Sequence, residues 1–376
     1  MHVQHLTLHD FRSYDTVEVE LGPGVTSFIG RNGQGKTNLV EAIDYLSRLT
    51  SHRVATDAPL VRQGCSQAVV RASVVRDDRV ALLEVEINPG KSNRARVNKS
   101  PLPRSRELLG LVRSVVFSPE DLALVKGDPS DRRRCLDDLL VLRAPRYAGV
   151  RADYDRILKQ RNALLKAARV NRRGRADEHF ESTLAVWNGQ LSRVGAELLA
   201  ARIALVDELQ PLVAAAYAEV APEGGAAALA YQPSFDLPLA LAPDRAALTA
   251  AFDAALTARQ QDEVDRGVSL VGPHRDELVL SLGPLPVKGY ASHGECWSFA
   301  LALRLASYDL LRAGGDDPIL ILDDVFAELD TDRRDRLAAR VAGAEQVLVT
   351  AAVPADVPVE LMGARFDVAH GKVTPA

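Results

Sequence analysis

The segment from Gly30 to Thr37 (Gly-Arg-Asn-Gly-Gln-Gly-Lys-Thr) constrains the fold more than any other part of the chain. It matches the pattern G-x-x-x-x-G-K-S/T, in which glycines let backbone N–H groups surround a phosphate without interference from a Cβ atom. Such a loop needs a buried strand before it and a helix after it. Residues 25–29 are apolar and β-branched, and residues 38–49 place apolar side chains on one helical face. The sequence therefore predicts a nucleotide-binding loop.

The residue types within this loop predict how a nucleotide is held. Lys36 adds a full positive charge near the β- and γ-phosphates, and the Thr37 hydroxyl is placed to ligate Mg²⁺. The following helix directs its positive end at the same anion. We therefore expect ATP and Mg²⁺ as ligands, with Lys36 also acting in catalysis. The expected binding residues are Gly30, Arg31, Asn32, Gly33, Gln34, Gly35, Lys36 and Thr37.

A second segment, at residues 318–325, carries two adjacent carboxylates. Residues 318–322 are uncharged and mostly aliphatic, which is typical of a strand buried on both faces of a parallel sheet. Asp323 and Asp324 follow at the carboxyl end of this strand, where open α/β sheets place their ligands. We expect Asp323 to hold Mg²⁺ together with Thr37, and Asp324 to orient or deprotonate an attacking water.

Composition limits the class of protein. The formal net charge of −4 indicates that any surface for nucleic acid is local rather than general. Cys65, Cys135 and Cys296 lie far apart, so neither a disulfide framework nor a zinc site is indicated. The first fifteen residues mix charged and apolar side chains, and no long apolar run follows. We expect a cytoplasmic protein without a secretory signal or a membrane partner.

The secondary structure that the sequence predicts changes along the chain. Strand patterns dominate up to about residue 120, helical patterns dominate residues 121–262, and strand patterns resume at 268–271. We predict an α/β P-loop ATPase head with a mixed sheet and flanking helices, formed by residues 1–120 and 263–376. Residues 121–262 are predicted to form an inserted, mostly helical lobe.

Three basic features each allow two interpretations. The segment Arg143–Arg175 is rich in arginine and lysine, with only Asp153 and Asp155 to oppose them, and it fits either a nucleic-acid backbone or a solvated helix surface. The turn-rich segment Lys91–Lys99 fits a DNA-phosphate contact or a solvated loop. Arg12, at the end of the first strand, fits a contact to the nucleotide phosphates or a solvated turn.

One further motif precedes a long helix predicted at residues 299–311. Ser292 is followed three residues later by Glu295, which matches a capping box and would by itself explain both residues structurally.

The order of these parts resembles a known group of proteins. A phosphate loop and a distant carboxylate pair, separated by an inserted lobe, are typical of the ABC-type ATPases of chromosome maintenance. Within this group the chain resembles the RecF family. The resemblance is carried by Phe11-Arg12, by residues 30–37, 117–127, 291–294 and 322–330, and by Gly272-Pro273-His274-Arg275-Asp276.

The resemblance implies a mechanism that the residue patterns alone do not. The Ser292 segment would be the signature motif, so Ser292 and Gly294 would reach the γ-phosphate held by a second protomer. Asp330 would lie in the loop that lines the partner's site. ATP would thus join two heads into a homodimer, and hydrolysis would release them. The family binds DNA and works with RecR and RecO to load recombinase at gaps.

The chain also departs from the expected family pattern. Glu295 and Cys296 replace the glutamines expected after the signature serine and glycine. No glutamine follows Phe117 to sense Mg²⁺, which leaves Ser118, Glu120 or Asp121 as substitutes, and the switch position offers Thr350 in place of histidine. These departures predict slow turnover. The insert is also too short for long coiled-coil arms, which separates the chain from cohesin-like proteins.

Two other functions remain open at this point. A small-molecule phosphotransferase would use the same loop, but it would leave the Ser292 segment and the basic segment unexplained. A nucleotide-gated DNA clamp would keep the loop and the dimer without significant hydrolysis.

Overall fold

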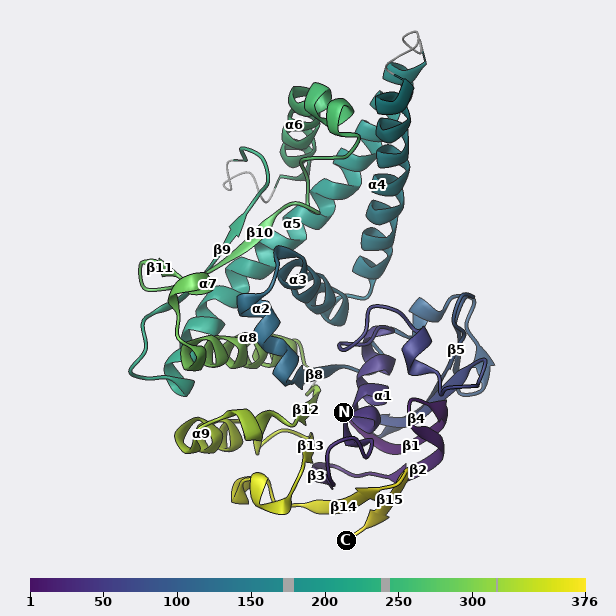
Figure 1. Cartoon of the computed structure of the whole chain (residues 1–376), viewed down its shortest axis with the longest axis vertical. Helices are drawn as coiled ribbons and strands as arrows, with labels where there is room; N and C mark the ends of the chain where they lie inside the picture. The colour runs from purple at the N-terminus through teal and green to yellow at the C-terminus, as the bar shows by residue number, and fades with distance from the viewer. Residues whose placement is uncertain (172–178, 238–243, 316) are drawn as a thin grey trace. The chain divides into compact units, whose positions relative to one another are not determined.

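The chain forms two compact units (Figure 1). A computed structural model describes residues 1–171, 179–237, 244–315 and 317–376. The first unit, here called the head, contains residues 1–123, 212–226 and 291–376. The second unit, here called the lobe, contains residues 124–211 and 227–290.

The unit boundaries differ in part from the predicted ones. The first boundary follows Ala123, close to the predicted position after residue 120. The return to the head follows Tyr290 rather than residue 262, and residues 212–226 also belong to the head. The later boundary arises because strand β10 (Glu277–Leu282) pairs with β9 (Ala227–Gln232), which keeps it within the lobe.

The head contains two six-stranded sheets. The first is antiparallel, in the order β2-β1-β4-β5-β6-β7. Its strands are β1 (His2–Phe11), β2 (Tyr14–Glu20), β4 (Ala68–Arg76), β5 (Arg79–Ile87), β6 (Arg94–Val97) and β7 (Ser100–Pro101). The second has the order β15-β14-β3-β13-β12-β8 and is parallel except for β15. Its strands are β3 (Gly24–Ile29), β8 (Ser114–Phe117), β12 (Ile319–Asp323), β13 (Gln346–Ala351), β14 (Ala364–Ala369) and β15 (Lys372–Pro375).

Helix α1 (Lys36–Arg48) packs against strands of both sheets, namely β1 and β4 of the first and β8, β12 and β13 of the second (Figure 1). Leu39, Ile43 and Leu46 are fully buried, as the helical spacing predicts. The helix ends at Arg48. The capping residue Leu49 donates the last helical hydrogen bond, to the Tyr45 carbonyl, and its left-handed conformation then turns the chain away. The other helices of the head are α8 (His293–Ala313) and α9 (Thr331–Val341), with 3-10 turns η1 (Ala58–Leu60), η2 (Ser105–Leu108), η3 (Pro119–Asp121), η5 (Val325–Glu328), η6 (Pro354–Asp356) and η7 (Val359–Leu361).

The strand predicted before the carboxylate pair is confirmed. All five residues of β12 are buried, and the strand lies parallel between β8 and β13. Strand β13 in turn pairs with β3, which precedes the phosphate loop. The loop after β3 and the carboxylates after β12 therefore leave the same edge of the sheet, with one strand between them.

The lobe is mostly helical, but it also contains a three-stranded antiparallel sheet in the order β11-β10-β9. Its helices are α2 (Leu122–Lys126, which begins in the head), α3 (Pro129–Arg143), α4 (Arg146–Asn171), α5 (Phe180–Val220, which ends in the head), α6 (Arg245–Arg266) and α7 (Val287–Tyr290), and its third strand is β11 (Leu285–Pro286). Within the described parts of the chain, no helix has both the length and the apolar character needed to cross a bilayer.

The strand predicted at 268–271 is wrong. The N–H of Ser269 bonds to Asn162 Oδ1 at 2.8 Å, and the N–H of Leu270 bonds to Glu263 Oε1 at 2.7 Å. Side chains thus satisfy the backbone groups that a strand would have used for pairing, so the segment stays irregular.

The Gly272–Asp276 motif lies inside the lobe and joins its elements. Asp276 accepts hydrogen bonds from the Tyr231 hydroxyl at 2.6 Å and from the Ser234 N–H at 2.7 Å. His274 Nδ1 accepts from the Tyr154 hydroxyl at 2.8 Å. Burial lowers the pKa of His274 to about 4, so its ring is neutral at physiological pH. The motif therefore has a structural role in the lobe.

Most arginines of the basic segment are paired with carboxylates. Arg143 binds Glu208 and Arg146 binds Glu197, both on α5; Arg151 binds Asp138 on α3, and Arg156 binds Asp153. Within the segment Asp153 and Asp155 are the only acids, but neighbouring helices supply further ones. A nucleic-acid contact along this segment stays a prediction. Arg172, Arg173 and Arg175 lie outside the described residues.

Arg161, in the middle of that segment, is fully buried. Its guanidinium donates to Glu263 Oε2 at 2.5 Å, to Ser269 Oγ at 2.7 Å and to Asn188 Oδ1 at 2.8 Å. Both Arg161 and Glu263 are shielded from solvent, so the pair depends on these bonds to offset the cost of desolvation.

We expect Arg161→Met to lower the free energy of unfolding of the lobe by about 3–5 kcal/mol, because Glu263 is left as an uncompensated buried charge. The measurement is urea denaturation of the whole chain followed by circular dichroism. Arg156→Ala, which removes an exposed pair, is the matched control and should cost less than about 1 kcal/mol. Adding Glu263→Gln to Arg161→Met should restore much of the loss, because glutamine removes the buried charge and keeps an acceptor for the Leu270 N–H. Equal effects of Arg161→Met and Arg156→Ala would contradict the assignment.

Candidate nucleotide-binding site

The loop at 30–37 joins β3 to α1 as predicted. Two of its glycines are required by close contacts: a Cβ at Gly30 would meet the Val368 carbonyl oxygen at 2.2 Å, and one at Gly35 would meet the Tyr14 hydroxyl at 2.8 Å. Gly35 also has φ of +108°, which disfavours L side chains. Strand β14 and the start of β2 therefore hold the loop in place from two sides.

Lys36 extends along the inside of this loop. Its side chain is only 3% exposed, and its Nζ lies 3.4 Å from Asn32 Oδ1 and 3.9 Å from Asp324 Oδ2. These partners are too distant to compensate the buried charge of the ammonium group fully, so Lys36 can bind an anion such as a phosphate. Arg31 and Asn32 are exposed, and Gln34 accepts a hydrogen bond from the His370 N–H at 2.8 Å.

Asp323 lies at the centre of a network of hydroxyl groups. Its Oδ1 accepts from Thr37 Oγ1 at 2.9 Å and from Thr350 Oγ1 at 2.6 Å. Burial raises the pKa of Asp323, and the charge of Asp324 adds to that effect, whereas the two hydroxyls oppose it. The carboxylate and the Thr37 hydroxyl are oxygen ligands of the kind that Mg²⁺ prefers, and they already lie within hydrogen-bonding distance. The donor set therefore fits Mg²⁺.

Thr350 connects this carboxylate to the next one. Its hydroxyl donates to Asp323 and accepts from the Asp324 N–H at 2.9 Å. Asp324 adopts φ of +50°, and its side chain is 35% exposed. The Thr350 bond helps hold this uncommon conformation, which leaves Asp324 open to solvent while Asp323 is buried.

Arg12 is not a solvated turn residue. Its side chain is 16% exposed, with Nε and Nη2 donating to Glu41 at 2.9 and 2.5 Å and Nη1 donating to the Pro59 carbonyl. Burial would raise the pKa of Glu41, but hydrogen bonds from Arg12 and Ser51 hold it below its ordinary value. A contact between Arg12 and the nucleotide phosphates stays a prediction.

The polar residues 51–53, which follow α1, pack against that helix. His52 Nδ1 donates to the buried Asp44 at 3.0 Å, and Arg53 donates to Glu41 at 3.1 Å. Burial opposes the charged form of His52, but its bond to Asp44 holds the pKa of His52 above its ordinary value. These contacts anchor the chain that leaves α1 against the helix itself.

The capping box predicted at Ser292 is present. The Ser292 N–H donates to Glu295 Oε2 at 2.8 Å, and Ser292 Oγ accepts from the Glu295 N–H at 3.3 Å. Ser292 is nevertheless exposed at the start of α8, so its hydroxyl can reach an external group. Cys296 is buried in the core, which explains an apolar side chain in place of the expected glutamine.

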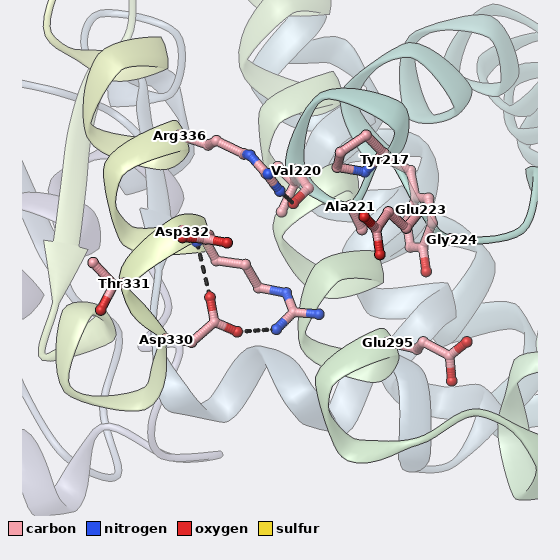
Figure 2. Close-up of a pocket in the computed structure, with 12 residues that line it drawn as sticks. Tyr217, Val220, Ala221, Glu223, Gly224, Glu295, Asp330, Thr331, Asp332 and Arg336 are labelled. Carbon is pink, nitrogen blue, oxygen red and sulfur yellow. Dashed lines mark hydrogen bonds and ion pairs between the residues drawn. The ribbon is translucent and has the colours of Figure 1, made fainter.

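A pocket of about 550 Å³ lies in the head beside this segment (Figure 2). Arg333 connects its parts: it forms an ion pair with Asp330, and its Nε donates to Ser298 Oγ at 2.8 Å. A Cβ at Gly294 would meet the Arg333 guanidinium at 3.3 Å. Sequence reasoning missed Arg333, although its spacing from Asp330 at the start of a helix was a usable signal. The pocket is lined by Tyr217, Val220, Ala221, Pro222, Glu223, Gly224, Glu295, Asp330, Thr331, Asp332, Arg333 and Arg336.

Ser118, Glu120 and Asp121 are the expected substitutes for the missing Mg²⁺-sensing glutamine, and they differ in whether their side chains already have partners. Ser118 and Asp121 are buried and form a capping box with each other, and Asp121 also binds Arg304 at 2.5 Å. Glu120 is exposed. Of the three, Glu120 is the candidate that has a free side chain in this structure.

A phosphate loop, a lysine inside it, and a threonine–aspartate pair at the edge of a parallel sheet define an ABC-type ATPase head. The profile described as the RecF/RecN/SMC N terminal domain matches residues 2–358. The chain belongs to the RecF family.

Related sequences align with the chain over nearly its whole length. A protein named DNA replication and repair protein RecF from Nocardioides sp. is 64% identical, with 99% of each chain covered. One with the same name from Streptomyces avermitilis is 61% identical, again over 99% of each chain. A solved structure described as the recombination mediator protein RecF-ATPrS in the RecFOR pathway matches with a TM-score of 0.89 and 26% identity, covering all of this chain and 98% of the other. A Smc head domain from Pyrococcus furiosus shares the fold, with a TM-score of 0.55 and 16% identity over all of this chain and 95% of the other.

We expect Thr350→Val to lower the free energy of unfolding by about 1–3 kcal/mol, because Asp323 and the Asp324 N–H both lose a buried hydrogen bond. The measurement is chemical denaturation without nucleotide or metal. Thr350→Ser keeps the hydroxyl and should retain most of the stability. If Val and Ser have the same effect, the hydroxyl does not organise the two aspartates.

Proposed function

We propose that this chain is an ATP-dependent DNA-binding protein of recombinational repair and DNA replication. ATP and Mg²⁺ drive two heads together on DNA, and slow, DNA-stimulated hydrolysis releases them. The observation that carries this proposal is the placement of Lys36, Thr37, Asp323 and Asp324 around one edge of the sheet, in a chain of the RecF family.

Within the head, the residues divide the chemistry between them. The loop at 30–37 and Lys36 bind the phosphates, and Thr37 and Asp323 would hold Mg²⁺, which supplies charge neutralisation at the phosphates. Asp324, which is partly exposed and lies 3.9 Å from Lys36 Nζ, orients a water molecule and accepts its proton. The water oxygen bonds to the γ-phosphorus as the bond to the ADP oxygen breaks, giving ADP and phosphate.

The second half of the site is proposed to come from a partner copy. Ser292 is exposed and Gly294 is kept free of a side chain, so this segment can approach a nucleotide on another head. The Asp330–Arg333–Ser298 contacts would make the loop at Asp330 and the start of α8 move together. ATP that contacts both heads stabilises the dimer by linkage.

The cellular role that we propose is based on the names and descriptions of the related proteins. Proteins named for DNA replication and repair cover the chain, and the similar RecF structures are described within the RecFOR pathway. We propose DNA, single-stranded or at a gapped duplex junction, as a ligand, RecR and RecO as partners, and the cytoplasm as the location. The departures in the signature segment also favour a second candidate, a clamp that binds ATP and DNA with little hydrolysis. The phosphotransferase interpretation has no support from the family.

We expect ATP to shift the wild-type chain from monomer to dimer, and expect neither Lys36→Met nor Ser292→Arg to dimerise. Lys36→Met removes the phosphate-binding charge and should lose most of its ATP affinity, whereas Ser292→Arg should retain ATP and lose only the contact to the second head. The measurement is sedimentation velocity with and without ATP, combined with nucleotide titration.

Ser292→Asp is the matched control for folding, because aspartate is also a good helix N-cap. It should preserve the stability of α8 while its charge repels the γ-phosphate, so this variant should also remain monomeric. A normal ATP-dependent dimer of either Ser292 variant would exclude the contact between protomers.

We expect Asp324→Asn to reduce single-turnover ATP hydrolysis about 10²–10⁴-fold while leaving ATP-dependent dimerisation intact. Asparagine has the same shape and tolerates the left-handed backbone conformation at this position. Hydrolysis by wild type at the same background rate as Asp324→Asn would instead support the clamp without significant hydrolysis.

A further inference from the structure

A hollow of about 960 Å³ lies at the edge of the first sheet of the head, away from the nucleotide loop in sequence. It is formed by the β5–β6 turn, by β6 and β7, and by η2. Cations dominate its lining, and none of its lining residues, all within the described chain, carries a carboxylate. The cations are Lys91, Arg94, Arg96, Arg104 and Arg106.

These cations differ in how far they are already neutralised. Arg96 forms ion pairs with Glu84 and Glu86, and Arg94 lies 3.7 Å from Glu86. Among the described residues, the structure shows no acidic partner for Lys91, Arg104 and Arg106, and all three side chains are exposed. The hollow therefore presents at least three uncompensated positive charges to a ligand.

The backbone around the hollow is fixed by its own hydrogen bonds. Asn93 Nδ2 donates to Asp57 at 2.6 Å and to the Tyr45 hydroxyl at 3.0 Å, and Asn93 Oδ1 accepts from the Asn88 N–H. The Leu102 N–H bonds to the Ala95 carbonyl at 2.9 Å, which ties β7 to β6. The charges are thus displayed on a preformed frame, so little ordering is needed when a ligand binds.

Helix α4 offers much less charge than its sequence indicates. Its arginines at 146, 151, 156 and 161 bind carboxylates, one of them in the buried core of the lobe. Lys159, Lys166 and Arg169 remain exposed, and Arg169 Nη1 donates to the Arg266 carbonyl at 3.2 Å. These three cations are spread along the helix, whereas the cations of the hollow line one cavity. An arginine that must break an ion pair before it binds phosphate gains less than one that is uncompensated.

We propose that the DNA phosphate backbone binds in this hollow of the head rather than along α4. The inference rests on the proposed function, since it locates the DNA that the function requires. The lining contains no aromatic side chain to stack on a base, so the contacts are to the backbone and independent of base sequence.

The test compares two sets of substitutions in the full chain. The hollow variant carries Lys91→Ala, Arg104→Ala and Arg106→Ala, and the matched α4 variant carries Lys159→Ala, Lys166→Ala and Arg169→Ala. DNA affinity is measured by fluorescence anisotropy from low to moderate salt, with duplexes of two unrelated sequences and with a single strand. ATP affinity is measured in parallel to show that the head is folded.

We expect the hollow variant to lose DNA affinity by at least tenfold at low salt. Its slope of log K against log salt should flatten by about 2–3, because three of its cations no longer bind phosphates of the duplex. The α4 variant should retain the affinity and the salt slope of the wild-type chain. A further variant, with Lys91 unchanged and with lysine in place of Arg104 and Arg106, should keep most of the wild-type slope, because lysine retains the positive charge.

Three results would overturn the inference: an unchanged slope in the hollow variant, a larger loss of affinity in the α4 variant, or competition by free pyrophosphate that matches DNA at equal phosphate concentration. Failure of the wild-type chain to bind any DNA would instead reject the proposed function.

Discussion

The hydrogen bonds of Thr350 to both aspartates depend on where β13 lies in the sheet. Strand β13 pairs in parallel with β12 on one side and with β3 on the other, and in this register Thr350 stands beside both Asp323 and Phe28. The phosphate loop and the carboxylates are separated by almost the whole chain, and this pairing brings Thr37 within 2.9 Å of Asp323. Shifting the register by one residue would turn Thr350 to the other face of the sheet and break the network.

The same sheet explains why two neighbouring aspartates have different properties. Asp323 is the last residue of a buried strand, so burial raises its pKa and hydroxyls must stabilise its charge. Asp324 leaves the strand in a left-handed conformation and reaches solvent. One buried and one partly exposed carboxylate are consistent with the proposed roles of Asp323 as a cation ligand and Asp324 as a base.

Charge in this protein follows tertiary contacts more than sequence density. The most arginine-rich segment is partly neutralised among its described residues, because α3, α5 and α6 supply carboxylates that lie far from it in sequence. The shorter basic segment at 91–99 is joined in the hollow by Arg104, which precedes η2, and by Arg106 within η2, and part of this charge stays uncompensated among the described residues. Counting charges along the chain therefore does not show how much of that charge is left uncompensated.

The sequence by itself determined the local elements of the site: the glycines of the loop, Lys36 and Thr37, the buried strand before Asp323, and the capping box at Ser292. These depend on residue type and short-range spacing, which are readable in one dimension. The tertiary structure alone decided that Arg12 binds Glu41, that Arg333 joins Asp330 to Ser298, that Arg161 is buried, and that β9 pairs with β10. Each of these depends on a partner distant in sequence or on an alanine-rich strand with weak propensity, and only packing selects such a partner.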